Sequence, residues 1–244
     1  MTKKIAIIGA GKMGSAMLKA LRPKFPKTKA YDKGTNLQKV TSAADVIIFA
    51  VKPQDFTKLD LELSNKLVIS IMAGISIKKI AAQIKSTRVV RTMPNLPLQI
   101  QEGLTGWIAS KNIKARDKRV TKKILKSFGQ EIELKKESEI EKITPLSGSG
   151  PAYFFYICKL IQKEAQARGF SKADAKKIAE QTFIGAAKVF EKDKKSADEW
   201  ITAVASKKGV TEQVIKHFDK EKFPKTFKQA ITKGIKRSKE LETE

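Results

Sequence analysis

Three glycines near the N-terminus, Gly9, Gly11 and Gly14, constrain the fold of this chain more than any other feature of its sequence. They follow an apolar run at residues 4–8 and precede apolar residues at helical spacing over 12–22, the order of a strand, a tight turn and a helix. In such a turn the first glycine permits the reversal, the second lets a ligand approach the backbone, and the third allows close helix packing. The pattern predicts that a dinucleotide pyrophosphate binds here, at Gly9, Ala10, Gly11, Lys12, Met13 and Gly14.

Short apolar runs alternate with helical patterns through the first part of the chain. This alternation predicts an α/β fold, a Rossmann-type doubly wound and mostly parallel sheet, over residues 1–144. We expect the further strands at 27–32, 46–51, 67–72, 88–92, 104–109 and 131–134, and further helices at 76–84 and 113–127.

From residue 145 onward the sequence shows helical periodicity only. It predicts an all-α C-terminal domain over residues 145–244. The helices are expected at 151–168, 172–191, 196–204, 211–219 and 224–242.

Two neighbouring residues at the end of the second predicted strand give opposite indications about the dinucleotide. Asp32 stands where a carboxylate accepts hydrogen bonds from a ribose 2′-hydroxyl, which favours NAD. Lys33 follows it and offers a positive charge to a 2′-phosphate, which favours NADP. These two residues therefore leave both cofactors open. The segment between Asp32 and the next strand is so short that a full crossover helix barely fits.

The composition limits the classes of function. The net charge is +25, but only seven of the 50 basic residues are arginine, the residue preferred for reading base edges, so we expect a lysine-rich surface and no specific nucleic-acid partner. One cysteine, Cys158, excludes an internal disulfide, and one histidine, His217, excludes a His-rich metal site. No apolar run is long enough to cross a membrane. We therefore expect a metal-free cytoplasmic protein without membrane contact.

Four further stretches are distinctive: F-A-V-K-P at 49–53, R-T-M-P-N at 91–95, L-S-G-S-G-P-A-Y at 146–153 and Q-T-F-I-G-A-A-K at 181–188. Together they resemble the pyrroline-5-carboxylate reductase family, over about residues 3–241. The resemblance implies hydride transfer from NAD(P)H to the C=N bond of 1-pyrroline-5-carboxylate, giving L-proline, with NADPH preferred. It also implies that further residues bind the cofactor, namely Ala50, Val51, Lys52, Pro53, Ala73, Gly74 and Asn95.

The same resemblance implies two substrate segments. Ser149, before Gly150 and Pro151, is interpreted as the N-cap of a helix whose free N–H groups face the substrate. The second segment, residues 206–211, reads S-K-K-G-V-T where the family usually has S-P-G-G-T-T. It implies substrate contacts from four residues and a catalytic hydroxyl at the ring nitrogen from the last of them: Ser206, Gly209, Val210 and Thr211.

The departures in this second segment have two interpretations. Lys208 replaces a family glycine, so a positive φ there costs on the order of 1 kcal/mol or more, whereas its charge would favour a substrate carboxylate. Thr211 also has a structural alternative, since Glu212 and Gln213 follow it and it could cap the next helix.

Two other functions compete with the one that the resemblance implies. The altered loop is also compatible with a related reductase of another imine or keto acid, and the high charge with a basic nucleic-acid-binding protein on this fold. The resemblance further implies a homodimer or higher homo-oligomer that pairs through the C-terminal helices.

Overall fold

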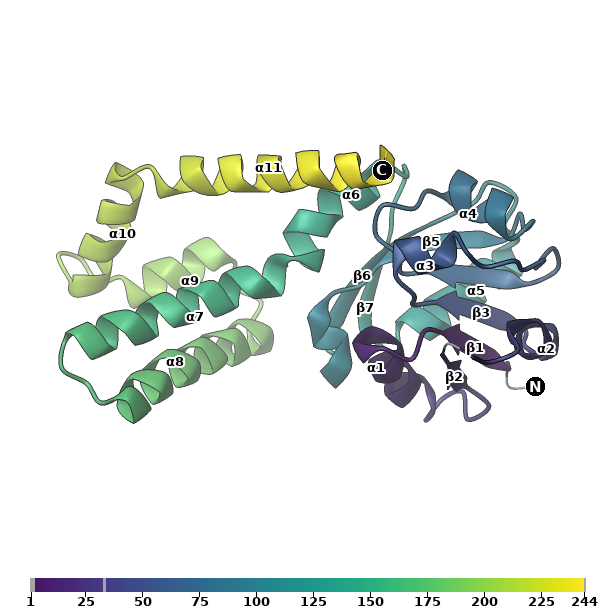
Figure 1. Cartoon of the computed structure of the whole chain (residues 1–244). Coiled ribbons are helices and arrows are strands. Elements are labelled where there is room, and N and C mark those ends of the chain that lie inside the picture. Colours follow the sequence, from purple (N-terminus) through teal and green to yellow (C-terminus); the bar gives the residue numbers. More distant parts are fainter. Residues whose placement is uncertain (1–2, 33, 244) are drawn as a thin grey trace. The chain divides into compact units, whose positions relative to one another are not determined.

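A computed structural model describes residues 3–32 and 34–243 of the chain (Figure 1). It divides into two compact units. The first unit comprises Met1–Pro151 together with Lys233–Glu244, and the second comprises Ala152–Thr232.

The first unit is built on a seven-stranded sheet with the strand order β2-β1-β3-β4-β5-β6-β7. Neighbouring strands are parallel except β5 and β6, which are antiparallel. The mostly parallel, Rossmann-type sheet that the sequence predicts is therefore confirmed. The strands are β1 (Ile5–Ile8), β2 (Lys29–Tyr31), β3 (Val46–Phe49), β4 (Leu67–Ser70), β5 (Val89–Met93), β6 (Gly103–Ala109) and β7 (Gly129–Glu133).

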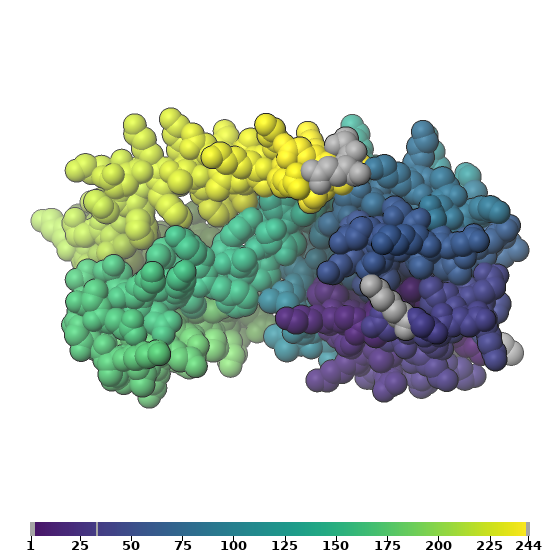
Figure 2. Space-filling model, viewed as in Figure 1, coloured from purple at the N-terminus to yellow at the C-terminus, as the bar shows by residue number. Residues whose placement is uncertain are grey.

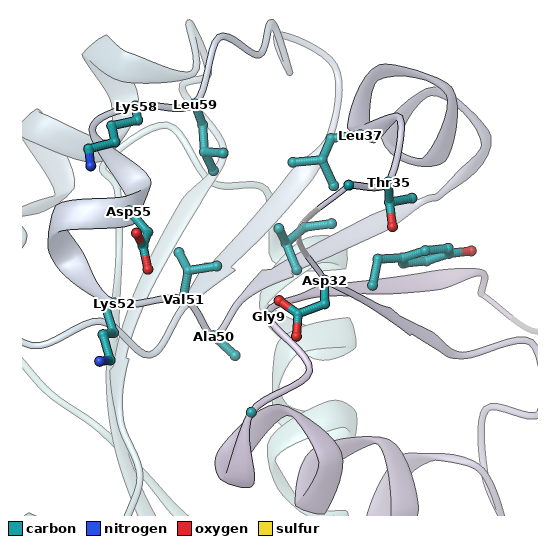
Figure 3. Close-up of a pocket in the computed structure, with 14 residues that line it drawn as sticks. Gly9, Asp32, Thr35, Leu37, Ala50, Val51, Lys52, Asp55, Lys58 and Leu59 are labelled. Atoms are coloured by element: carbon teal, nitrogen blue, oxygen red, sulfur yellow. The ribbon is translucent and has the colours of Figure 1, made fainter.

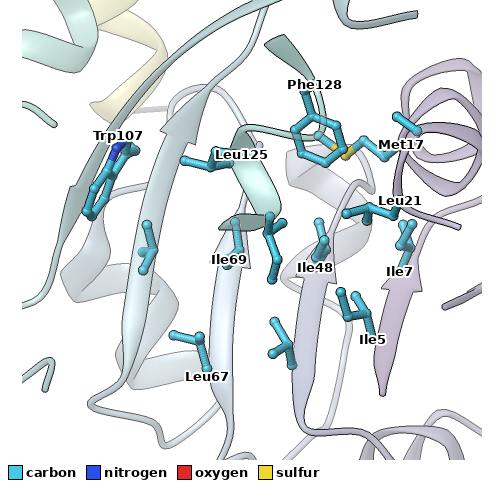
Figure 4. Close-up of a cluster of buried hydrophobic side chains, with 14 of the residues drawn as sticks. Ile5, Ile7, Met17, Leu21, Ile48, Leu67, Ile69, Trp107, Leu125 and Phe128 are labelled. Carbon is cyan, nitrogen blue, oxygen red and sulfur yellow. The ribbon is translucent and has the colours of Figure 1, made fainter. Parts of the chain in front are cut away.

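Helices cover both faces of this sheet, because its central strands are apolar on both faces. On one face, Ile5 and Ile7 of β1 pack with Met17 and Leu21 of α1 (Figure 4). On the other face, Ile8 belongs to a second apolar cluster. The helices of this unit are α1 (Lys12–Leu21), α2 (Leu37–Ala43), α3 (Pro53–Phe56), α4 (Ile77–Gln83), α5 (Ala115–Leu125) and α6 (Glu139–Ile143), with a 3-10 turn at Leu96–Ile100.

The short segment after Asp32 does contain a crossover helix, α2, of seven residues. The side chain of Asn36 caps it by accepting a hydrogen bond from the Lys39 N–H at 3.0 Å. A small helix of this kind connects the edge strand β2 to β3 with few residues. Lys33 lies outside the described residues.

The junction at residue 149 corrects the interpretation of Ser149 as a helix N-cap. A π-helical segment, Thr144–Gly148, connects α6 to α7 (Gly150–Ala167), so the chain stays helical here. Ser149 has right-handed helical φ and ψ, and its N–H donates to the Thr144 carbonyl at 2.8 Å. An N-cap has extended backbone, so the prediction is wrong on this point.

The C-terminal end of the chain belongs to the first unit, unlike the predicted division at residue 144. Arg91 of β5 is 1% exposed and forms ion pairs with Glu137, Glu141 and Glu242 at 3.0, 2.9 and 3.1 Å. Helix α11 (Phe223–Thr243) carries Glu242. Within the first unit, the buried guanidinium therefore links α6, the residues before it and the end of α11 to β5.

The second unit consists of helices, as the sequence predicts. Its buried residues, among those described, are Ala165, Ala175 and Ala179. Large apolar side chains of α7 and α8 are instead exposed, including Phe154, Phe155 and Phe190. Figure 2 shows the surface of these helices in teal and green. Alongside α7 and α11, its helices are α8 (Lys172–Lys192), α9 (Ala197–Val204) and α10 (Val210–Lys220).

Candidate functional site

The register of three parallel strands brings the predicted cofactor residues to one edge of the sheet. Ile8 at the end of β1 pairs with Tyr31 of β2 on one side and with Phe49 of β3 on the other. The residues that follow these strands therefore meet at the carboxyl edge, where parallel sheets bind ligands. They are Gly9, Asp32 and Ala50.

Gly9 has a conformation and a position that exclude other residues. Its φ is +108°, and a Cβ there would lie 2.6 Å from the Ala50 carbonyl oxygen. Its N–H donates to the Tyr31 carbonyl at 2.8 Å. The first glycine thus forms the turn, as predicted. It is hydrogen-bonded to the last residue of β2 and packs against the residue that follows β3.

Gly14 and Gly11 serve different purposes. A Cβ at Gly14, inside α1, would overlap the Gly9 carbonyl oxygen, so this glycine permits the close packing of helix and loop. Gly11 is the N-cap of α1 with a φ of −68°, and a Cβ there would meet no atom within 4 Å. Neither backbone strain nor protein packing explains a glycine at position 11. The open space at Gly11 would admit a ligand to this backbone, and a pyrophosphate has suitable chemistry.

The start of α1 also has the chemistry for an anion. No side chain caps the helix, so its first N–H groups lack a capping acceptor. They carry the positive end of the helix dipole and suit a phosphate group. The predicted residues Lys12 and Met13 supply two of these N–H groups.

A pocket of about 600 Å³ lies at this edge of the sheet (Figure 3). Six of the residues predicted to bind the cofactor line it, and its volume suits part of a dinucleotide. They are Gly9, Gly11, Asp32, Ala50, Val51 and Lys52. Other lining residues were not predicted from the sequence, chiefly Tyr31, Thr35, Asp55, Lys58 and Leu59.

Several of these residues could have been predicted because they lie next to predicted cofactor residues in the sequence. Tyr31 directly precedes Asp32, and Thr35 follows Gly34, which has a φ of +88°. Asp55 lies in α3, which begins directly after Lys52 and contains Pro53 at its first turn. A prediction that extended the cofactor site by a few residues on either side of Asp32 and after Lys52 would therefore have included them.

Two other predicted cofactor residues have structural tasks in this chain. Gly74 has a φ of +73°, and a Cβ there would strike the backbone of Leu241 in α11. The side chain of Asn95 accepts a hydrogen bond from the Leu104 N–H at 2.8 Å and donates one to the Ser147 hydroxyl at 3.3 Å. The pocket lining includes neither of them, nor Ala10, Lys12, Met13, Gly14, Pro53 or Ala73.

The predicted substrate loop lies in the second unit, at the start of α10. Lys208 has a φ of +59°, so lysine does occupy a left-handed position where the family usually has glycine. Its N–H donates to the Glu212 carboxylate at 2.6 Å, and Lys216 pairs with the same carboxylate at 3.0 Å. The Lys216 ammonium and the Lys208 N–H lower the pKa of the Glu212 carboxyl, which keeps this support ionised.

The structure decides the alternative role of Thr211. Gly209 is the N-cap of α10, and Thr211 is the second residue of the helix, so Thr211 is not the cap. Its hydroxyl has no hydrogen-bond partner among the described residues, and its side chain is half-buried. Val210 is 83% exposed and Ser206 is exposed. The loop thus presents a hydroxyl that local structure does not use. His217 is exposed on the same helix.

Two further features concern metals and membranes. Among the described residues, no group of three or more His, Cys, Asp or Glu side chains is placed to hold a metal ion. Every helix in residues 3–32 and 34–243 is too short or too polar to cross a bilayer.

Two family models match the chain. The one described as "Pyrroline-5-carboxylate reductase dimerisation" matches residues 137–241, and the one described as "NADP oxidoreductase coenzyme F420-dependent" matches residues 26–74. A pyrroline-5-carboxylate reductase of Haemophilus influenzae is 32% identical, over 99% of this chain and 98% of its own length.

Solved structures of pyrroline-5-carboxylate reductases are also similar to this chain. A pyrroline-5-carboxylate reductase from Coxiella burnetii has a TM-score of 0.90 and 29% identity, covering 99% of each chain. A Plasmodium falciparum pyrroline carboxylate reductase with NADP bound has a TM-score of 0.84 and 25% identity, covering 98% of each chain. On the full-length likeness to the Haemophilus protein, with these structures in agreement, the chain belongs to the pyrroline-5-carboxylate reductase family.

Proposed function

We propose that this chain reduces 1-pyrroline-5-carboxylate to L-proline with NADPH. The observation that carries the proposal is the glycine loop with its open space at Gly11, in a chain whose relatives of this name match it from end to end. When bound, NADPH supplies the hydride, which adds to the imine carbon while the nitrogen ends as the protonated amine of proline. An iminium accepts hydride directly, and the neutral amine that results takes up one proton from solvent, so the reaction needs no histidine or carboxylate as a base.

The residues of the first unit hold the cofactor in this proposal. The N–H groups at the start of α1 bind the pyrophosphate, and Gly11 leaves room for it. Asp32 directly follows β2 and lies beside the glycine loop, where it suits a ribose hydroxyl (Figure 3). Ala50, Val51 and Lys52 continue the pocket wall.

We propose NADPH as the preferred cofactor and NADH as a poorer one. The matching NADP oxidoreductase model and the relative with NADP bound support the first choice. Asp32 supports some use of NADH, since a carboxylate binds a free 2′-hydroxyl.

The loop at the start of α10 holds the substrate in this proposal. The N–H groups of Lys208 and Gly209 donate to the Glu212 carboxylate and the Ser206 carbonyl, so the remaining backbone N–H groups of this loop bind the substrate carboxylate, and the Thr211 hydroxyl meets the ring nitrogen. The unused hydroxyl of Thr211 supports this role. Ser149 is exposed at the junction and is proposed as a further substrate contact.

The exposed apolar helices support a homodimer. Alanines alone are buried among the described residues of the second unit, whereas Phe154, Phe155 and Phe190 are each more than half exposed. Such a surface needs a partner, and the matching dimerisation model fits a second copy of the chain. We place this enzyme in the cytoplasm, where its single cysteine stays reduced.

The test of the proposed reaction is a rate measurement with freshly prepared 1-pyrroline-5-carboxylate. We expect oxidation of NADPH that depends on the imine, faster than oxidation of NADH at the same concentration. Thr211→Val should lower kcat/KM by about 10²-fold or more, whereas Thr211→Ser, which keeps the hydroxyl, retains most activity. A wild-type enzyme that oxidises neither cofactor contradicts the proposal, and faster reduction of a larger cyclic imine favours the alternative reductase.

The test of the dimer is the molecular mass in solution. We expect sedimentation equilibrium to show a dimer or larger species for the wild type and for Phe155→Leu, which stays apolar. Phe155→Asp should shift the mass toward the monomer. An unchanged mass for this variant contradicts the interface.

A further inference from the structure

A basic recess lies at the amino-terminal edge of the sheet in the first unit. It has a volume of about 530 Å³ and is formed by Lys3, two residues before β1, by the turn after α1, and by α5 with its C-cap. Five of its lining side chains are cationic and the others are Phe25 and Val120. The cationic ones are Lys3, Lys24, Arg116, Lys123 and Lys126.

This recess is separate from the cofactor pocket. Lys3 precedes β1 and Gly9 follows it, and at about 3.3 Å per residue the two lie about 20 Å apart along the strand. The lining residues of the cofactor pocket and of the recess do not overlap. The recess therefore has no part in the proposed reduction.

The arrangement of α5 concentrates positive charge in the recess. Arg116, Val120 and Lys123 follow one another at spacings of four and three residues, so they share one face of the helix. Lys126 continues the row three residues later. Of these cations, Lys123 and Lys126 lie three residues apart and repel each other, which disfavours the arrangement unless an anion compensates it.

The acidic residues near α5 are already paired with other cations. Asp117 is bound by both the Nε and the second terminal nitrogen of Arg88, each at 2.9 Å. Glu133 pairs with Lys118 at 2.6 Å and Lys122 at 2.9 Å. These carboxylates cannot neutralise the row that faces the recess.

At the other wall, Lys3 is 3.6 Å from Asp45, a loose pair. The four other cations of the recess have no acidic partner among the described residues. They are Lys24, Arg116, Lys123 and Lys126.

We propose that this recess binds a small polyphosphate anion. The volume suits a small ligand rather than an extended strand of nucleic acid. Lysines act as point charges for phosphate oxygens, and Arg116 can bind one phosphate through two N–H groups. The phosphate chain of a nucleoside triphosphate and inorganic tripolyphosphate share this chemistry. Phe25 is half-buried in the lining and offers a ring for a base in the first case.

The test compares two variants of equal net charge. Lys123→Ala with Lys126→Ala removes two charges from the recess, whereas Lys78→Ala with Lys111→Ala removes two exposed charges from elsewhere in the same unit. Calorimetric titration with tripolyphosphate, with NADP present in excess to fill the cofactor pocket, should show binding about tenfold or more weaker for the recess variant. The control variant should stay within about twofold of the wild type, and thermal melts should confirm that both are folded.

The outcomes distinguish the source of the phosphates and can overturn the proposal. Tighter binding of ATP than of tripolyphosphate, with the difference removed by Phe25→Leu, identifies a nucleotide. Equal binding of both identifies the phosphate chain alone. Equal weakening in the two lysine variants shows a general effect of charge and overturns the proposal. A short single-stranded oligonucleotide that binds more tightly than tripolyphosphate also overturns it.

Discussion

The glycines at positions 11 and 14 allow cofactor binding to be separated from folding stability. A Cβ at Gly14 would overlap the Gly9 carbonyl oxygen and lie 3.0 Å from the carbonyl carbon and 3.4 Å from Ile7 Cγ2. The nearest obstacle is backbone, which cannot rotate away, so Gly14→Ala must displace α1 from β1. Overpacking of this kind costs about 1–3 kcal/mol, and we expect the upper half of that range for the free energy of unfolding.

Gly11→Ala adds the same methyl group three residues earlier with the opposite effect. It meets no protein atom within 4 Å, and the φ of −68° suits alanine. Alanine restricts the unfolded chain but is a poorer N-cap than glycine, so the two effects oppose each other and the free energy of unfolding should change by less than about 1 kcal/mol. The methyl occupies the space proposed for the pyrophosphate, so we expect the Kd for NADPH to rise at least about tenfold, or about 1.4 kcal/mol.

The assay pairs urea denaturation with a fluorescence titration of NADPH on each variant. Gly11→Ala should lose affinity at full stability, and Gly14→Ala should lose stability. Wild-type affinity in Gly11→Ala, or wild-type stability in Gly14→Ala, would refute the division of roles between the two glycines.

Three other predictions concern stability. Lys222 has a φ of +58° after α10, so Lys222→Gly should raise the free energy of unfolding by about 1 kcal/mol in urea denaturation, and a lower value contradicts the strain. Arg91→Met leaves buried Glu141 without its cation and should cost about 3–5 kcal/mol, whereas a loss below 1 kcal/mol would show that the ion pairs contribute little. The Lys4 N–H, 2.8 Å from the carboxylate, lowers the pKa of Asp45, so its stabilisation is present above the pKa of the unfolded chain and is lost as the pH falls through the lower folded value. Asp45→Asn should therefore destabilise by no more than about 1 kcal/mol at neutral pH and by nothing near pH 2, and an effect independent of pH contradicts this.

The strands were predictable because a buried strand appears in the sequence as a short run of apolar residues. Ile5–Ile8 and Val46–Phe49 are fully buried four-residue runs, and each stands out as an apolar run between polar segments. The glycine loop was predictable for the same reason, since its turn depends on neighbouring residues. The pocket around it follows from the register of parallel strands.

Long-range packing and an unusual helical turn explain what the sequence did not reveal. A glycine after a strand, such as Gly74, is typical of a ligand site. In this chain the glycine is needed because a Cβ there would collide with the backbone of Leu241, which is distant in the sequence. Ser149 before Gly150 and Pro151 has the local pattern of an N-cap, yet a wide π-helical turn around Pro145 keeps the chain helical. Neither the Leu241 contact nor the π-helical turn can be predicted from the residue types at neighbouring positions.

The substrate loop, residues 206–211, was predicted only in part. The sequence predicted that lysine at position 208 would be strained if the backbone there were left-handed, and the structure shows a positive φ. It did not predict that the Glu212 carboxylate would hold the Lys208 N–H. That support uses a side chain four residues later, which a comparison with the usual loop sequence does not reveal.

The most direct test of the proposed reaction is the transfer of a label. NADPH carrying deuterium at the transferred position of the nicotinamide should be incubated with 1-pyrroline-5-carboxylate and this enzyme, and the proline then analysed by mass spectrometry. We predict L-proline that carries one deuterium at the former imine carbon. Proline without deuterium, or no proline despite oxidation of the cofactor, would contradict direct hydride transfer to the imine.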